Sequence, residues 1–243
     1  MLVAYLVQAL LLYDVAISFA TSSGLEKKTF SDEWRNVVLK FHNERRRRLA
    51  KGMQPTAGGK LMPYAKDMHE LEWDFDMEAE AKAFICDPTL PSVDFGVTYD
   101  SIDLDGSTSI ISTRTRAILH KWWNQAKRID LSSDPIYVRE KIREFGIMAL
   151  AKNTHLACAY GSCANGGKLL CMYDQMPMSS HALYQKATVP AEICTACSVS
   201  TQCVNSLCSS RKPDGSITGS FIASSYENIK RTSATICTNR SSG

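Results

Sequence analysis

Cysteine content constrains the fold of this chain more than any other feature of its sequence. Four cysteines fall within the string CTACSVSTQCVNSLC, which starts at Cys194. The C-x-x-C spacing of Cys194 and Cys197 suits zinc, but Cys203 and Cys208 do not form a second close pair. We therefore favour a disulfide-held module over a zinc knuckle. The total is odd, so at least one thiol is free or pairs between chains. The nine cysteines are Cys86, Cys158, Cys163, Cys171, Cys194, Cys197, Cys203, Cys208 and Cys237.

The N-terminal stretch MLVAYLVQALLLYDVAISFA indicates secretion into such an oxidising compartment. It is apolar and ends with Ser18 and Ala20 at the −3 and −1 positions of a cleavage site. No positive charge precedes the apolar core and Asp14 interrupts it, so a short buried helix or strand is the alternative. A membrane span needs about 20 apolar residues, and we predict none in this chain. The sequence thus predicts a signal peptide over 1–20, a polar leader over 21–29 and a secreted, extracellular protein.

Charge balance excludes one class of partner. The chain has 28 basic and 25 acidic residues and a net charge of +3. A nucleic-acid-binding protein carries a clustered, larger excess of positive charge, so we predict no nucleic-acid partner. Asn239 begins the N-glycosylation sequon NRS, and the secreted chain is expected to be a glycoprotein.

Hydrophobic periodicity and turn residues predict a mixed α and β chain. Ser31 is a good N-cap for a helix that runs to about Ala50 and stops near Gly52. The most regular helical spacing follows at Ala65, Met68 and Leu71 and continues toward Cys86. The expected elements are helices over 31–50, 65–86 and 113–128, a buried strand over 144–151, and a β-hairpin over 155–175 with its turn at Gly166 and Gly167.

Four motifs together resemble a known family. HNERRRRLAKG is similar to the first-helix pattern H-N-x-x-R-x-x-L-A-x-G, and AKDMHELEWDFDMEAEAKAFIC is similar to a second pattern that ends in cysteine. LLCMYDQMPM is similar to a C-x-Y signature, and the four cysteines after Pro190 to a hinge. In this order, the motifs resemble the secreted CAP superfamily, also called SCP/TAPS, and specifically the nematode venom-allergen-like and activation-associated secreted proteins.

The resemblance implies an α/β (α+β) fold and a domain organisation. A three-layer α-β-α sandwich, the CAP or SCP domain, is expected over 30–180, and a cysteine-rich hinge with a C-terminal tail over 181–243. It also implies the disulfides Cys86–Cys163, Cys158–Cys171, Cys194–Cys203 and Cys197–Cys208. Cys237 is then left unpaired or joins two chains in a disulfide-linked dimer.

Many CAP proteins hold a divalent metal with two His and two Glu, and this chain departs from that pattern. Counting back from Cys158 puts Glu144 where one His is expected, and Gln125 follows the Trp pair where a Glu is expected. GVTYDSIDL contains no Glu at the place of another, and no His lies between His69 and His120. We therefore predict a degenerate cleft with no metal, no cofactor and no catalytic residues.

The run Arg45, Arg46, Arg47 and Arg48 allows three interpretations. An exposed helix end is favoured because basic side chains complement the helix dipole there and point in four directions. An anionic-ligand patch for a sulfated glycan is the second, since arginine suits sulfate geometry. Cleavage by a convertase is the third.

The missing metal ligands and the added hinge favour a secreted, non-catalytic interaction protein of the host–parasite type, with an unidentified extracellular partner. A lipid or sterol carrier is the alternative, and it needs an apolar groove. A metal-dependent hydrolase is the least favoured, because it needs ligands that this chain lacks.

Overall fold

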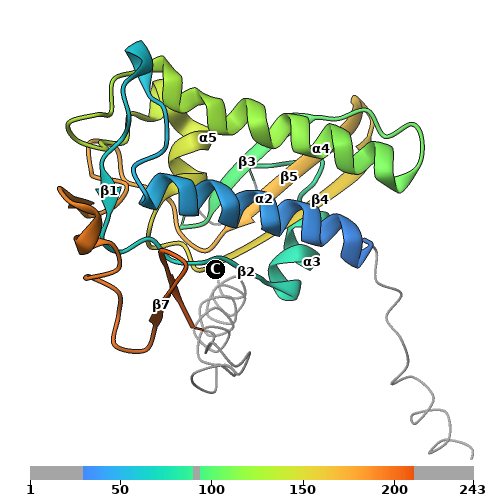
Figure 1. Cartoon of the computed structure of the whole chain (residues 1–243). Coiled ribbons are helices and arrows are strands. Elements are labelled where there is room, and N and C mark those ends of the chain that lie inside the picture. Colours follow the sequence, from blue (N-terminus) through green and yellow to red (C-terminus); the bar gives the residue numbers. More distant parts are fainter. Residues whose placement is uncertain (1–29, 90–93, 211–243) are drawn as a thin grey trace, which may run out of the picture.

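A four-stranded sheet with helices on both faces forms the body of the molecule (Figure 1). The computed structural model describes residues 30–89 and 94–210, so the predicted signal peptide, the leader, Cys237 and Asn239 lie outside the described residues. The order of the sheet is β2-β4-β5-β3, with β2 parallel to β4 and the other pairs antiparallel. The helices are α2 (Asp32–Ala50), α3 (Phe75–Ala83), α4 (Thr108–Trp123) and α5 (Arg139–Ala149), with 3-10 turns η1 (Ala57–Gly59), η2 (Asn124–Arg128) and η3 (Pro190–Glu192). The strands are β1 (Tyr64–Ala65), β2 (Glu72–Trp73), β3 (Gly96–Ser101), β4 (His155–Cys163), β5 (Gly166–Tyr173), β6 (Lys186–Ala187), β7 (Gln202–Val204) and β8 (Leu207–Ser209).

Both ends of helix α2 follow from local sequence. The Ser31 hydroxyl accepts a hydrogen bond from the Trp34 amide at 3.2 Å, which caps the first turn. At the other end Gly52 adopts φ of +65°, and its amide donates to the Leu49 carbonyl at 2.8 Å. Glycine reaches this left-handed conformation at little cost, so the helix stops there. The predicted start and stop are confirmed.

Strand alternation separates the two helical layers. Tyr160 of β4 packs edge-on against Trp34 of α2, with ring centroids 4.9 Å apart. The next residue, Gly161, faces the other side of the sheet, where a Cβ would lie 3.5 Å from the Ile85 side chain just after α3. Helix α2 therefore covers one face and α3 the other, which confirms the predicted three-layer α-β-α sandwich.

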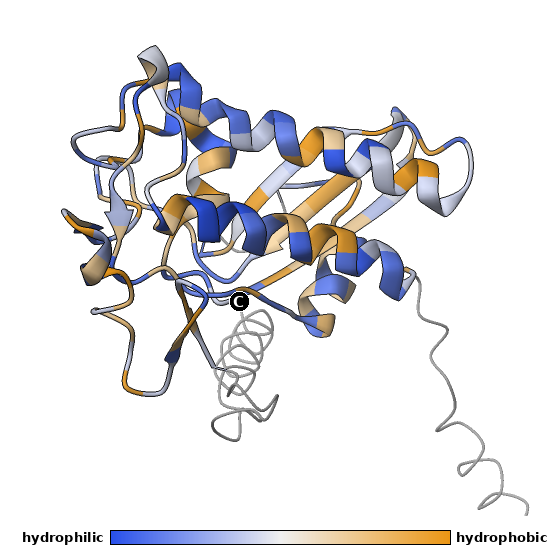
Figure 2. Cartoon of the chain, viewed as in Figure 1, coloured by the Kyte–Doolittle hydropathy of each residue, from blue (hydrophilic) through white to orange (hydrophobic). Residues whose placement is uncertain are grey.

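The core lies between the sheet and the pair α2 and α4. The Trp34 indole donates to the Thr115 hydroxyl at 3.0 Å and joins these two helices inside the protein. Figure 2 shows orange, hydrophobic residues along β5 behind the helices, and blue, hydrophilic residues on the C-terminal half of α2. The four large aromatic side chains Trp34, Trp122, Trp123 and Phe145 are all at most 2% exposed.

The predicted helix over 65–86 is wrong in its first half. Only 75–83 is helical, beginning where Asp74 accepts a hydrogen bond from the Met77 amide. Residues 64–73 instead form two short strands, β1 and β2, joined by a non-helical segment, because Asn43 holds the Leu71 backbone through two 2.9 Å hydrogen bonds and β2 pairs with β4. Tertiary contacts with α2 and the sheet thus override the helical spacing of this segment.

The predicted strand over 144–151 is also wrong, because Glu144–Ala149 belong to α5. A short apolar run suits a buried helix as well as a strand, and here Gly146 gives Tyr137 room to pack against the helix. The third helix is confirmed in type, although it begins at Thr108 and becomes a 3-10 turn at Asn124. The hairpin is confirmed, with its turn at 164–165 rather than at the two glycines.

The cysteine-rich segment packs on the sandwich rather than standing apart from it. The Cys208 amide donates to the Met68 carbonyl at 2.8 Å, and the Glu70 amide donates to the Cys208 carbonyl at 2.9 Å. Leu207 is fully buried in the main core. Within 30–89 and 94–210, no helix has the length and apolar character needed to cross a bilayer.

Candidate functional site

The four consecutive arginines of α2 point to different places, and the second one is a core residue. Arg46 is completely buried. Its guanidinium donates to five backbone carbonyls at 2.9–3.1 Å, those of His69, Met148, Leu150, Ala151 and Asn153. Burial lowers the pKa of Arg46 to about 10, so it stays charged at neutral pH. One side chain thereby holds together α2, the end of α5 and the segment before β2.

The neighbouring arginines have separate partners. Arg45 lies 3.2 Å from His120 of α4. Arg47 donates to the Asn205 carbonyl in the hinge at 3.1 Å, and Arg48 is exposed. The prediction of an anionic-ligand patch formed by all four is therefore wrong, because a helix distributes consecutive residues around its axis and Arg46 faces the core. A convertase would have to unfold α2 before it could reach this run.

The two degenerate cleft positions meet in space. Gln125 lies in η2 and Glu144 in α5, and the Gln125 amide nitrogen donates to a Glu144 carboxylate oxygen. The other side-chain atom of Gln125 accepts from the amides of Glu144 and Phe145 at 3.0 and 3.2 Å. Arg143 lies 3.4 Å from the second carboxylate oxygen of Glu144. Both polar groups of Gln125 are thus satisfied within the protein.

These residues do not fit the metal that many CAP proteins hold. Zinc is bound by imidazole, thiolate or carboxylate, and a cleft site needs several such ligands around one point. At this location the side chains offer only the carboxylates of Glu140 and Glu144 among four cations, and the Glu144 carboxylate already accepts from an amide and lies beside a guanidinium. The sequence supplies no histidine between His69 and His120. The donor set of this cleft is therefore incomplete.

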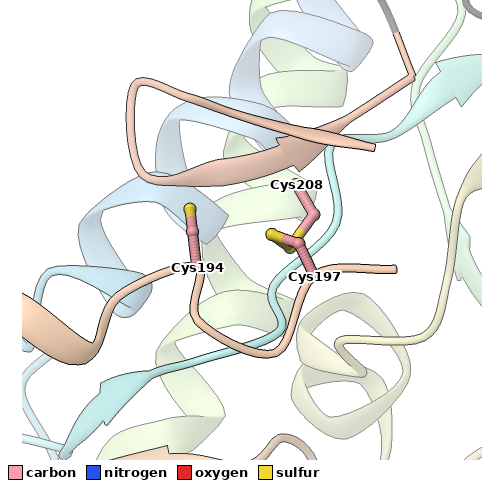
Figure 3. A group of neighbouring side chains, drawn as sticks. All are labelled: Cys194, Cys197 and Cys208. Carbon is pink, nitrogen blue, oxygen red and sulfur yellow. A yellow bond between two sulfur atoms is a disulfide. The ribbon is translucent and has the colours of Figure 1, made fainter. Parts of the chain in front are cut away.

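Among the described residues, the one group with metal-ligand spacing is the trio Cys194, Cys197 and Cys208. Their sulfur atoms lie within 4.8 Å of one another (Figure 3). Each sulfur is in a disulfide, because Cys194 pairs with Cys203 and Cys197 pairs with Cys208. Thiolates, not disulfide sulfurs, bind zinc, so the oxidised hinge is not a zinc knuckle.

The other two disulfides lie in the sandwich. Cys158–Cys171 joins directly opposite residues of β4 and β5. Cys86–Cys163 connects the segment after α3 to the end of β4. All four pairs are those that the family resemblance implies.

The histidines of the described chain occupy varied positions. His42 is fully buried between α2 and β5. His69 lies in the segment before β2, where it forms a β-bridge with Cys208. His120 is half-buried on α4, His155 begins β4, and His181 is exposed.

Sequence patterns missed two hollows of the surface. A groove of about 600 Å³ lies between α2 and α4. A second hollow of about 450 Å³ lies beside Glu144, lined by Arg128, Arg139, Glu140, Lys141, Arg143 and Glu144. The alternation of basic and acidic residues in VREKIRE is the sequence signal that could have indicated the hollow beside Glu144.

Comparison with known proteins assigns the family. Residues 39–173 match the profile of the cysteine-rich secretory protein family, CAP, and this chain belongs to that family.

One curated relative is the Ancylostoma secreted protein of Ancylostoma caninum, 31% identical over 156 residues, which are 62% of this chain and 36% of that protein. Among solved structures, Na-ASP-1 has a TM-score of 0.61 at 26% identity and covers 79% of this chain and 49% of its own. NaASP2, solved with Zn²⁺, has a TM-score of 0.63 at 19% identity over 76% of this chain and all of its own, which shows the fold alone. This chain thus spans about a third and about a half of the lengths of the first two.

Proposed function

We propose that this chain is a secreted CAP-domain protein that acts by binding extracellular partners, of the host–parasite type, and has no catalytic activity of its own. The observation that carries this proposal is the contact between Gln125 and Glu144. A carboxylate and an imidazole at these places would face a metal, whereas an amide and a carboxylate satisfy one another. This contact supports the proposal, because a metal that acts as a Lewis acid or activates a water needs several free imidazole, thiolate or carboxylate ligands around one point.

Secretion is part of this proposal and has separate support. The described residues contain four disulfides, which persist in oxidising compartments. The relative from Ancylostoma caninum is called a secreted protein. An extracellular protein without a metal site is expected to act through ligands or partners that bind to its surface.

Metal binding tests the proposal directly. The oxidised protein is dialysed against zinc chloride, and bound zinc is counted by elemental mass spectrometry, with NaASP2 treated in parallel. We expect no stoichiometric zinc, and Glu144→Ala should leave the count unchanged. One equivalent of zinc that disappears in Glu144→Ala would overturn the proposal. Keeping the protein oxidised prevents hinge thiolates from binding zinc in its place.

A lipid or sterol carrier is the second candidate, and the groove between α2 and α4 favours it. Val37 and Phe41 lie in this groove beside Lys40 and Arg116. This arrangement suits an amphipathic ligand whose acidic head lies against the cations and whose apolar part lies on the two apolar side chains. The remaining lining residues are Glu33, Asn36 and Glu44.

Displacement of a fluorescent fatty acid and of a fluorescent sterol distinguishes the two candidates. Val37→Asp adds a charge to the groove, and Val199→Asp is the control because Val199 is fully exposed in the hinge. Saturable binding that Val37→Asp abolishes and Val199→Asp preserves would make the carrier function the better proposal. Absence of binding in the wild type leaves the first proposal in place.

A further inference from the structure

The hollow beside Glu144 carries an excess of positive charge. Four of its six lining side chains are basic, namely Arg128, Arg139, Lys141 and Arg143, and two are acidic, Glu140 and Glu144. Four cations and two carboxylates leave two positive charges around one hollow of about 450 Å³. The whole chain has a net charge of only +3, so this small region holds much of the excess.

Three cations of this hollow have no carboxylate partner. Within residues 30–89 and 94–210, no ion pair involves Arg128, Arg139 or Lys141. Some cations elsewhere lie against carboxylates, as Lys60 does with Asp130 at 2.6 Å and Lys121 with Asp100 at 2.8 Å. The charges around the hollow therefore remain available to an anion from solution.

Two adjacent backbone segments, η2 and the first turn of α5, place these cations next to one another. Arg139 and Lys141 lie in the first turn of α5, and Arg128 ends η2. The Arg128 guanidinium donates to the Lys141 carbonyl at 3.2 Å, which holds the two segments together. Glu144 neutralises only part of the positive charge around the hollow, because its carboxylate already accepts a hydrogen bond from the Gln125 amide and lies beside Arg143.

We propose that this hollow binds sulfate esters of an extracellular sulfated polysaccharide without a metal ion. This inference rests on the proposed extracellular function. Three of the four cations are arginines, whose planar guanidinium donates paired hydrogen bonds that match sulfate oxygens. The hollow beside Glu144, which lacks a full set of metal ligands, thus offers cations to the oxygen atoms of a sulfate group.

A membrane surface is the competing source of the same oxyanion chemistry. Peripheral binding to a bilayer combines cations with exposed apolar side chains that enter the acyl boundary. None of the large hydrophobic side chains exposed in the described chain lines this hollow. A polar chain bearing many sulfates therefore fits the hollow better than a lipid headgroup.

The test compares two triple variants of the full, oxidised protein for binding to a heparin oligosaccharide by isothermal titration in EDTA. Arg128→Gln, Arg139→Gln and Lys141→Gln remove three cations from the hollow. Arg48→Gln, Lys51→Gln and Lys152→Gln remove three cations that lie outside the hollow and have no ion pair within the described residues, and they serve as the matched control. We expect the hollow variant to weaken binding by about tenfold or more, and the control by less than about threefold. Thermal melting checks that both variants fold.

Five results would overturn the proposal. Four of them are no heparin binding by the wild type, equal losses in both triple variants, equal affinity for unsulfated hyaluronan, and binding to phosphoinositide vesicles in place of heparin. The fifth is binding that requires added zinc, whereas stoichiometric zinc with unchanged heparin binding in EDTA would contradict only the proposed loss of the metal site.

Discussion

His42 and Tyr173 are 131 residues apart in the sequence, yet the His42 Nε2 atom lies 2.7 Å from the Tyr173 hydroxyl. The other ring nitrogen, Nδ1, lies 2.8 Å from the Val38 carbonyl. A carbonyl only accepts, so Nδ1 carries the proton and Nε2 accepts from the tyrosine. The contact fixes a neutral imidazole inside the protein and joins α2 to β5.

Stability should therefore fall as His42 is forced to take up a proton. Burial, with the nearby Arg46 cation, lowers the pKa of His42 to about 4 from 6.5. Between these values the unfolded chain binds a proton that the folded chain does not, so the free energy of unfolding decreases as the pH falls. The full effect is about 3 kcal/mol. Urea denaturation at a series of pH values measures it.

His42→Gln is the control for this pH dependence. The glutamine amide can still reach Tyr173 but does not titrate. Between pH 6.5 and 4, the free energy of unfolding of the variant should therefore change with pH less steeply than that of the wild type, by the slope that one proton contributes. Carboxylates titrate in both proteins and cancel in the difference. Identical slopes would show that His42 is not held neutral.

Arg46 and Arg48 are two residues apart and should respond very differently to the same substitution. Arg46→Met removes the guanidinium donor from five carbonyls, of which those of Leu150 and Ala151 keep a backbone donor, and should cost about 3 kcal/mol or more. Arg48→Met changes an exposed residue and should stay within about 0.5 kcal/mol. Urea denaturation of both variants measures the difference, and similar losses would contradict the burial of Arg46.

Sequence reasoning succeeded where local chemistry decides structure. The cap at Ser31 and the glycine at Gly52 define α2, and alternation defines the hairpin of β4 and β5. The family resemblance supplied the disulfide pairs, which spacing alone leaves open.

Sequence reasoning failed where contacts with distant segments determine the local structure. Leu71 is extended because Asn43 of α2 binds its backbone, and no local pattern reports that contact. The identical letters of the arginine run also conceal that Arg46 is a core residue. Gln125 and Glu144 were assigned separately, and only the fold reveals that they touch.

Gln125→Glu should introduce a repulsion that disappears in acid. Two carboxylates would then share the space that an amide and a carboxylate occupy, which raises the pKa of the introduced carboxyl group. The folded state then favours the protonated form, so the loss of stability is greatest above the raised pKa of the folded state and shrinks as the pH falls from that value toward the unfolded pKa. We expect a deficit of about 1–3 kcal/mol at pH 7.

Gln125→Met separates repulsion from lost hydrogen bonds. It leaves the amides of Glu144 and Phe145 without this acceptor, removes one donor from the Glu144 carboxylate and adds no charge, so its cost of about 1–3 kcal/mol should change with pH less than that of Gln125→Glu. Chemical denaturation at pH 7 and pH 4 compares the two variants. A Gln125→Glu deficit that persists unchanged at pH 4 would contradict the proximity of the two side chains.

The two hinge disulfides should differ in how firmly they hold the hinge on the sandwich. Cys208 is buried and its backbone bonds to Met68 and Glu70, whereas Cys203 is exposed on the neighbouring strand β7 and its pairing with β8 does not depend on the disulfide. Replacing Cys197 and Cys208 with Ala should therefore release the segment 66–70, while replacing Cys194 and Cys203 should loosen only the segment around Cys194. Both closed loops are short, with separations of 11 and 9 residues, so their chain-entropy contributions are nearly equal at about 3 kcal/mol.

Hydrogen exchange of the Glu70 and Cys208 backbone amides distinguishes the two double variants. Protection should fall when Cys197 and Cys208 are replaced and persist when Cys194 and Cys203 are replaced. Equal protection in both would mean that Leu207 and the backbone hydrogen bonds hold the hinge without its covalent link.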